Sequence, residues 1–162
     1  MISFSTLTKV KINKGFHNSL PVLFRFGTPD WEYDIQIISH SPIKGEDEKD
    51  WNKLIGIKKD FFDPHKKSLM VGWRDTENGR ELNFYKHDGN TIHGEPFTII
   101  SKNDTINVKF TQDGNLTYIC VTVMGKAFAE RIDIKRGFLI NQWFGGTSSA
   151  PIDYYTYFRK RK

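Results

Sequence analysis

The sequence has little cysteine and no long apolar run. Its single cysteine, Cys120, cannot form an internal bridge, so a disulfide scaffold is excluded. No segment approaches the roughly 18 apolar residues that a membrane-spanning helix needs, and we expect no membrane partner. The N-terminus lacks the basic start, apolar segment and small-residue cleavage site of a secretion signal. The protein is therefore expected either not to be exported by that route or to have lost the signal before residue 1.

Outside the C-terminus, the positive and negative charges of the sequence nearly cancel. The net charge is +5, and Arg159, Lys160, Arg161 and Lys162 account for four of these charges, which leaves +1 for the rest of the chain. A domain with so small a net charge has no strong positive field to attract a phosphate backbone. We therefore expect nucleic acid only as a partner of this tail. We expect residues 159–162 to be a solvated, frayed end after a single domain of residues 1–158.

Helical periodicity is nearly absent, and strand patterns dominate. Asn78-Gly79 predicts a tight hairpin turn in which Trp73 faces Phe84 and Val71 faces Lys86. The apolar residues then share one face of the hairpin, namely Leu69, Val71, Trp73, Leu82 and Phe84. The other face carries the polar residues Arg74, Asn83, Tyr85 and His87.

Three further hairpins are predicted at turns that contain glycine. Asp113-Gly114 places Val108 opposite Ile119, and the others lie at Asp88-Gly89-Asn90 and near Met124-Gly125. The remaining strand candidates are residues 6–12, 20–26, 32–39, 52–59, 96–101 and 152–159, with a charged loop over 41–50. Roughly ten to twelve short strands with turn signals every 8–12 residues are typical of an antiparallel sandwich or barrel. Glu130 interrupts the apolar alternation of the strand before Lys135, so we expect it at a sheet edge or in an ion pair.

A resemblance to a known fold family lies in two segments. Residues 141–151, with Trp143, Phe144 and Gly145-Gly146 ahead of Ala150-Pro151, run into a tyrosine-rich segment. This stretch resembles the last loop and strand of concanavalin A-like jelly rolls, including some polysaccharide lyases. Residues 50–57 and 70–74 are similar to the early strands of small jelly-roll proteins of gut and marine bacteria and their bacteriophages. The resemblance implies an antiparallel jelly-roll β-sandwich, an architecture that serves lectins, glycan-cleaving enzymes and capsid proteins alike.

A catalytic site is not expected. The alternating carboxylates of jelly-roll glucanases are missing, since Glu46-Asp47-Glu48 lies in the charged loop. Arg74, Asn83, Tyr85 and His87 have the chemistry of an alginate-type lyase, which needs a base, an acid and groups that neutralise a uronate. The lyase motifs match only in part, because Thr91-Ile92-His93 lacks their glutamine. A two-residue turn at Asp88-Gly89 would also place His87 and His93 on opposite faces, unless the loop is odd in length.

No metal or cofactor is expected either. The five histidines show no zinc-ligand spacing, and Asp75, Asp88, Asp104 and Asp113 are assigned to turns, where aspartate bonds the backbone. A calcium ion in one of these loops stays open as an alternative.

The expected function is a non-enzymatic interaction module. The first hypothesis is a structural or decoration protein of a bacteriophage virion, located in the particle, with other virion proteins as partners and a homo-oligomer possible. The second is a carbohydrate-binding module that recognises a surface glycan, and the third is a divergent polysaccharide lyase. The candidate binding residues are Arg74, Asn83, Tyr85, His87, Trp143 and Phe144. Trp143 and Phe144 are either a structural plug over the edge of the sandwich or an aromatic platform for a sugar or a protein.

Overall fold

A computed structural model describes residues 7–42, 50–145 and 149–161 of the chain. The described residues form fourteen strands and no helix. The first sheet has the order β12 (Lys126–Asp133), β11 (Leu116–Val123), β10 (Ile106–Asp113), β4 (Trp31–Ile37), β14 (Tyr154–Lys160), β1 (Leu7–Ile12) and β2 (Ser19–Leu20). The second has the order β3 (Phe26–Gly27), β13 (Gly137–Ile140), β5 (Asn52–Lys58), β6 (Lys67–Thr76), β7 (Gly79–Asp88) and β8 (Asn90–His93), with β9 (Thr98–Ile100) also paired to β7.

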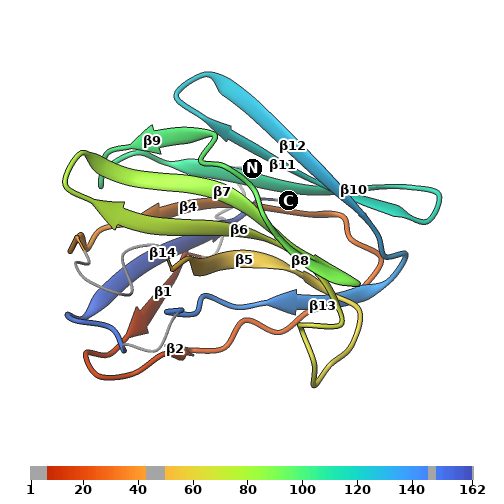
Figure 1. Cartoon of the computed structure of the whole chain (residues 1–162), viewed down its shortest axis with the longest axis horizontal. Coiled ribbons are helices and arrows are strands. Elements are labelled where there is room, and N and C mark those ends of the chain that lie inside the picture. The colour runs from red at the N-terminus through yellow and green to blue at the C-terminus, as the bar shows by residue number, and fades with distance from the viewer. Residues whose placement is uncertain (1–6, 43–49, 146–148, 162) are drawn as a thin grey trace, which may run out of the picture.

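The two sheets lie face to face as an antiparallel jelly-roll β-sandwich, as the sequence predicts (Figure 1). Alternating strands supply the core between them, and β4 is buried at every second residue from Trp31 to Ile37. Trp73 from β6 is fully buried there and contacts the ring of Tyr154 from the opposite sheet. The described residues contain no helix with the length and apolar character to cross a bilayer.

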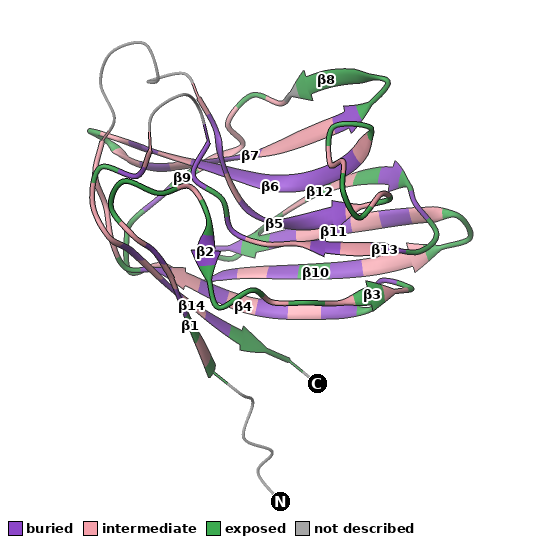
Figure 2. Ribbon diagram, turned by 90° about the horizontal axis from the view of Figure 1, so that it is seen from below, coloured by how far each residue is buried: buried purple, intermediate pink, exposed green. Residues whose placement is uncertain are grey.

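The central strand β6 departs from simple alternation. It is buried at almost every residue between Ser68 and Asp75 (Figure 2). Its inner side chains belong to the core, so the burial of Ser68 and Met70 shows that the outer face of this sheet is covered too. The sequence suggests an exposed polar face here. In the structure, other segments of the chain cover much of this face instead.

Two predicted hairpins form with the expected faces but a different register. Trp73 pairs with Leu82 and Val71 with Phe84, because the turn residues are Glu77 and Asn78. The positive φ falls on Gly79, at 135°. In the second hairpin Val108 pairs with Val121, since the turn residues are Gly114 and Asn115 rather than Asp113 and Gly114. Each partner is displaced by two residues, which leaves every side chain on its predicted face.

The other two hairpins are also present. Met124 and Gly125 form a turn in which both residues have positive φ, at 49° and 73°. Between β7 and β8 only Gly89 lies outside the pairing, since Asp88 pairs with Asn90. The loop is therefore odd in length, which is the alternative to a two-residue turn that the sequence leaves open, and the backbone of His93 is in register with Tyr85.

The strand predicted over residues 20–26 is wrong. Only its two ends pair, in β2 and β3, which belong to different sheets. Pro21 has no N–H to donate to a ladder, so the chain leaves the first sheet after Leu20. The remaining strand candidates are present within a few residues of their predicted bounds.

The C-terminal end is ordered through Arg161, against the expected frayed tail. Lys160 pairs with Tyr33 as the last residue of β14. The Arg161 guanidinium donates to Asp34 Oδ2 at 2.7 Å, and its backbone N–H donates to Glu32 O at 2.8 Å. The acidic residues of β4 thus bind the basic end, while Lys162 lies outside the described residues.

Candidate functional site

A cleft of about 640 Å³ lies on the outer face of the second sheet. Its floor is formed by β5, β6 and β7 through Lys53, Lys58, Met70 and His87. One wall is the segment around β2, another is Pro64-His65, and β13 with the residues after it closes the third side up to Trp143. The cleft is therefore assembled from segments that are far apart in the sequence.

Trp143 joins these segments. It forms isolated bridges with both Asn18 and Lys53, and it exchanges two backbone hydrogen bonds with Lys53 at 2.8 and 2.9 Å. Its indole stacks on the His17 ring at 5.4 Å between centroids and 21° between planes, and it stays 40% exposed. The His17 ring thus covers one face of the indole, and Trp143 also lines the cleft.

Phe144 points the opposite way. It is 1% exposed and contacts Trp73 and Tyr154 inside the sandwich, so it presents no surface to a ligand. Phe144 is thus a structural plug, and the platform alternative is left to Trp143 alone, whose ring stays exposed. Of the loop that follows, Gly145 is described, and Gly146, Thr147 and Ser148 lie outside the described residues.

The four predicted polar residues do share one face, but they do not form one site. His87 lines the cleft, with Nδ1 at 2.9 Å from the Thr91 hydroxyl. Asn83 is completely buried and donates to Gly94 O at 3.0 Å. Arg74 is bound to Glu81 at 2.5 Å and lies over the Trp51 ring. Arg74 and Asn83 therefore serve the structure of the sheet outside the cleft.

Tyr85 is linked to the cleft through Lys53. The ammonium group of Lys53 lies 4.5 Å from the centre of the Tyr85 ring and donates to Trp51 O at 2.9 Å. Burial lowers the pKa of Lys53, and Asp50 opposes this shift. Burial also raises the pKa of Tyr85, with a further contribution from Asp50. The tyrosine thus acts as a neutral aromatic partner of a partly desolvated cation.

Two further residues of the wall have unmet hydrogen-bonding capacity. Ser19 and Gln142 are 3% and 2% exposed. Neither the Ser19 hydroxyl nor either polar atom of the Gln142 amide has a hydrogen-bond partner within the described part of the chain. Sequence reasoning missed both residues, and it also missed Lys53, Lys58 and His65. No local pattern marks them, because only the tertiary fold brings β2, β5 and β13 to the same surface.

Asp75, assigned to a turn, lies instead in a buried ion pair. Its carboxylate accepts a hydrogen bond from Arg80 Nε at 2.7 Å and one from the Tyr154 hydroxyl at 3.2 Å. Arg80 also donates to the carbonyls of Ile37 and Ser39. The pKa of Tyr154 is raised mainly by burial and, to a smaller extent, by the negative charge of Asp75. Since its groups are paired with one another inside the sandwich, this cluster has a structural role.

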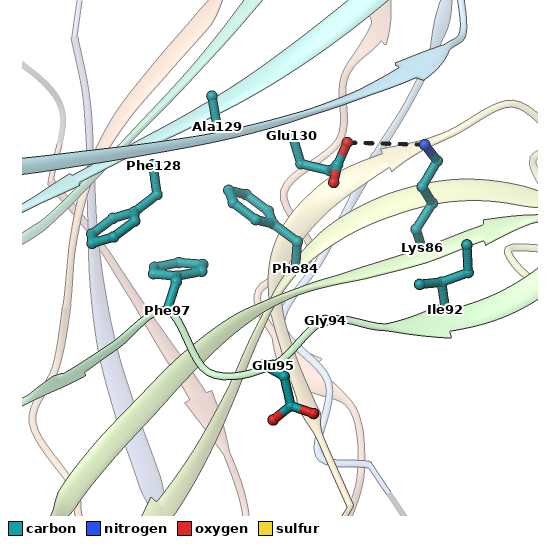
Figure 3. A pocket seen from close by; sticks show the side chains of 9 residues that line it. All are labelled: Phe84, Lys86, Ile92, Gly94, Glu95, Phe97, Phe128, Ala129 and Glu130. Atoms are coloured by element: carbon teal, nitrogen blue, oxygen red, sulfur yellow. Dashed lines mark ion pairs between the residues drawn. The ribbon is translucent and has the colours of Figure 1, made fainter.

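A second, smaller cavity of about 340 Å³ lies where β12 approaches β7 and β8 (Figure 3). Phe97 lies between Phe84 and Phe128, at centroid distances of 4.9 and 4.5 Å. Glu130 is on the edge strand β12 at 4.0 Å from Lys86 Nζ, as its place in the sequence predicts. This cavity is mainly apolar, whereas the larger cleft gathers charged, amide, hydroxyl and aromatic groups. The larger cleft is therefore the better candidate site.

Comparison with known proteins defines the fold class. No protein-family model and no curated protein matches the sequence. A functionally unknown protein from Saccharomyces cerevisiae is similar in structure, with a TM-score of 0.56, 8% identity, and coverage of 96% of this chain and 87% of that one. A xylan β-1,4-xylosidase from Bacillus halodurans has a TM-score of 0.50 and 13% identity, and the match covers 82% of this chain and 28% of that one. A scytalido-glutamic peptidase has a TM-score of 0.40 at 9% identity, with coverage of 96% of this chain and 65% of that one.

The likenesses to the yeast protein and to the xylosidase show the sandwich fold and nothing more specific. The chain spans little more than a quarter of the xylosidase, as the 28% coverage states. Function must therefore be argued from the surface of this protein.

Proposed function

We propose that the protein is a non-enzymatic interaction module that binds a carbohydrate in the cleft on the second sheet. The observation that carries this proposal is the exposed indole of Trp143, stacked on His17 beside a polar cleft. A pyranose presents an apolar C–H face that stacks on an aromatic ring and hydroxyls that need hydrogen-bond partners. Lys53 supplies such a partner within the same cleft, and Gln142 and Ser19 lie in its wall.

Two features support binding without catalysis. The residues that could together act as the base, the acid and the carboxylate-neutralising groups of a lyase do not meet in the cleft, because His87 lines it and Arg74, Asn83 and Tyr85 do not. Hydrolysis by paired carboxylates requires two acidic residues beside the substrate. No aspartate or glutamate is among the described residues that line the cleft. The cleft thus favours recognition over bond cleavage.

Binding to a broad panel of immobilised glycans tests this proposal. We expect Trp143→Ala to abolish binding and Trp143→Phe, which keeps a stacking ring, to retain part of it. Tyr118→Ala, a half-buried aromatic residue of β11 in the other sheet, is the matched control and should bind as the parent does. If no glycan binds, or if Trp143→Ala binds equally well, the proposal is wrong. Release of unsaturated, ultraviolet-absorbing products from a polyuronate would overturn its non-enzymatic part.

A second candidate, a structural or decoration protein of a bacteriophage virion, is favoured by a different surface. Phe24, Phe26, Phe61, Phe62 and Phe138 contact one another beside β3, and we call them the phenylalanine patch. Phe62 is 89% exposed and Phe24 is 68% exposed. Clustered apolar side chains in water mark surfaces that another protein covers. In this hypothesis the partner is another virion protein or a second copy of the chain.

The composition of purified particles distinguishes this candidate. Mass spectrometry should find the chain at a fixed copy number in virions whose genome encodes it. Replacing Phe24 and Phe62 by serine should reduce incorporation without unfolding the protein. A chain absent from particles would contradict the virion hypothesis and leave the glycan proposal standing.

A further inference from the structure

The charge of the cleft is one-sided. Lys53 and Lys58 line it together with His65 and His87, and no carboxylate does so among the described residues. The whole chain carries 19 acidic residues, so acids are common elsewhere. Asp50 and Asp60 act on the two lysines from outside the lining. A cleft with cations and no lining acid selects an anion by charge complementarity.

We propose that the ligand is an acidic carbohydrate, whose carboxylate or sulfate group is held by Lys53 beside the aromatic pair of Trp143 and His17. This inference rests on the proposed glycan binding and specifies its chemical class. The bridge between Trp143 and Lys53 makes the two residues direct neighbours, since they exchange both backbone hydrogen bonds. A sugar ring on the indole therefore places a charged substituent within reach of the ammonium group.

The surroundings of Lys53 support this assignment. Lys53 is half-buried, and one of its three N–H groups donates to Trp51 O. Partial burial of a cation costs solvation free energy, and a bound anion offsets this cost. The lowered pKa of Lys53 records that cost, and a bound carboxylate or sulfate would raise the pKa again. Lys58, the other lysine of the cleft floor, also has a pKa lowered by burial.

Gln142 and Ser19 lie in the wall of the cleft, and their polar atoms are buried behind its surface. The Gln142 amide offers two N–H donors and an acceptor, and the Ser19 hydroxyl offers one donor. Both side chains are more than nine-tenths buried in the wall, and their polar atoms have no partner within the described residues. A buried polar group without a hydrogen bond is costly, so these side chains would gain a partner if they turned toward a ligand bound in the cleft.

The test compares matched neutral and acidic polysaccharides by calorimetry. The probes are a neutral mannan, a polyuronate and a sulfated galactan. We expect binding to a polyuronate or to a sulfated galactan at least tenfold tighter than to mannan, with affinity that falls as sodium chloride is added. The two acidic probes separate a carboxylate from a sulfate as the recognised group.

Variants then test whether the lysines of the cleft bind the acidic group. Lys53→Met keeps the aliphatic stem and should weaken acidic binding about tenfold, which corresponds to the loss of one partly desolvated ion pair. Lys53→Arg should retain most of it. The control is Lys109→Met, an exposed position of β10 in the other sheet, which should bind as the parent does. If Lys53→Met fails to fold, as circular dichroism will show, Lys58→Met takes its place with the same expected direction.

The outcomes separate this inference from the proposed function. Equal or tighter binding of the mannan, lost in Trp143→Ala, overturns the acidic class and leaves glycan binding intact. Acidic binding that Lys53→Met and Lys58→Met leave unchanged also overturns the inference. If no polysaccharide binds the parent protein, the proposed function itself fails.

Discussion

The guanidinium of Arg80 donates to the carboxylate of Asp75 across 2.7 Å, and both side chains are almost completely buried. These residues are paired across the β6–β7 hairpin, Asp75 two positions before the turn residue Glu77 and Arg80 two positions after the turn residue Asn78. The Tyr154 hydroxyl from the opposite sheet completes the cluster. The ion pair joins the two strands of the hairpin that underlies the cleft, and its hydrogen bond with Tyr154 connects this hairpin to the other sheet.

Breaking this pair on one side should strongly destabilise the protein. Asp75→Asn leaves the Arg80 cation buried without its counter-charge, and we expect the free energy of unfolding to fall by about 3–5 kcal/mol. Urea unfolding measures the change. Lys66→Ala, which removes an exposed partner of Asp60, is the control and should change stability by less than about 1 kcal/mol. Equal effects of the two substitutions would show that the buried pair has no special role.

Tyr154 should make stability sensitive to alkaline pH. Its pKa is raised above the ordinary value of 10.0, so the folded state favours the neutral phenol. This contribution is complete below pH 10.0 and is lost as the pH rises above it, because the unfolded chain then releases the proton first. Tyr154→Phe removes the titrating group and its hydrogen bonds. At neutral pH the variant should be less stable by about 1–3 kcal/mol.

The pH series gives the sharper test. Above pH 10.0 the difference between the parent and Tyr154→Phe should shrink, because only the parent loses the Tyr154 contribution. Tyr118→Phe, on the other sheet, is the matched loss of one hydroxyl and should change stability little at neutral pH. A parent-to-variant gap that stays constant as the pH rises would contradict the assignment.

Gly56 should resist replacement by any larger residue. A Cβ atom built there lies 2.4 Å from the Leu69 carbonyl oxygen and 2.8 Å from Met70 Cα, both backbone atoms of the neighbouring strand. Gly56→Ala therefore has to push β5 and β6 apart, at a cost of about 1–3 kcal/mol in thermal or urea unfolding. Gly114→Asn is the control, since its turn has open space and a φ of 59° that asparagine tolerates. Unchanged stability of Gly56→Ala would contradict the close approach.

The architecture could be predicted from the sequence because side chains alternate along a strand. The register of the β6–β7 hairpin was predicted two residues away from the observed one, yet Trp73 and Leu82 still face the core. A shift of two residues keeps every face, so the sandwich does not depend on locating the turn correctly. The same argument explains why Val108 is a core residue although its partner was assigned wrongly.

The site could be predicted only in part. His87 and Trp143 carry visible chemistry and do line the cleft. Lys53, Ser19 and Gln142 carry no local signal, because they meet only after β2 and β13 close over the sheet. Asn83 and Arg74 share the polar face of β6 and β7. Periodicity does not reveal that their hydrogen-bonding groups are already bound within the chain, to Gly94 O and to Glu81. Alternation separates two faces and cannot show what covers the second.

Trp143 and Phe144 should respond oppositely to the same substitution. Phe144 is 1% exposed and contacts Trp73, so Phe144→Ala opens a cavity in the core and should lower the free energy of unfolding by about 3–5 kcal/mol. Trp143 is 40% exposed, and its backbone bridges to Asn18 and Lys53 persist when the ring is removed. Trp143→Ala should therefore cost much less stability, about 1 kcal/mol, while glycan binding is lost. Urea unfolding and calorimetry on the same two variants separate the roles. A large loss of stability in Trp143→Ala would mean that its indole is a structural plug, and the rim of the cleft would then lose its aromatic platform.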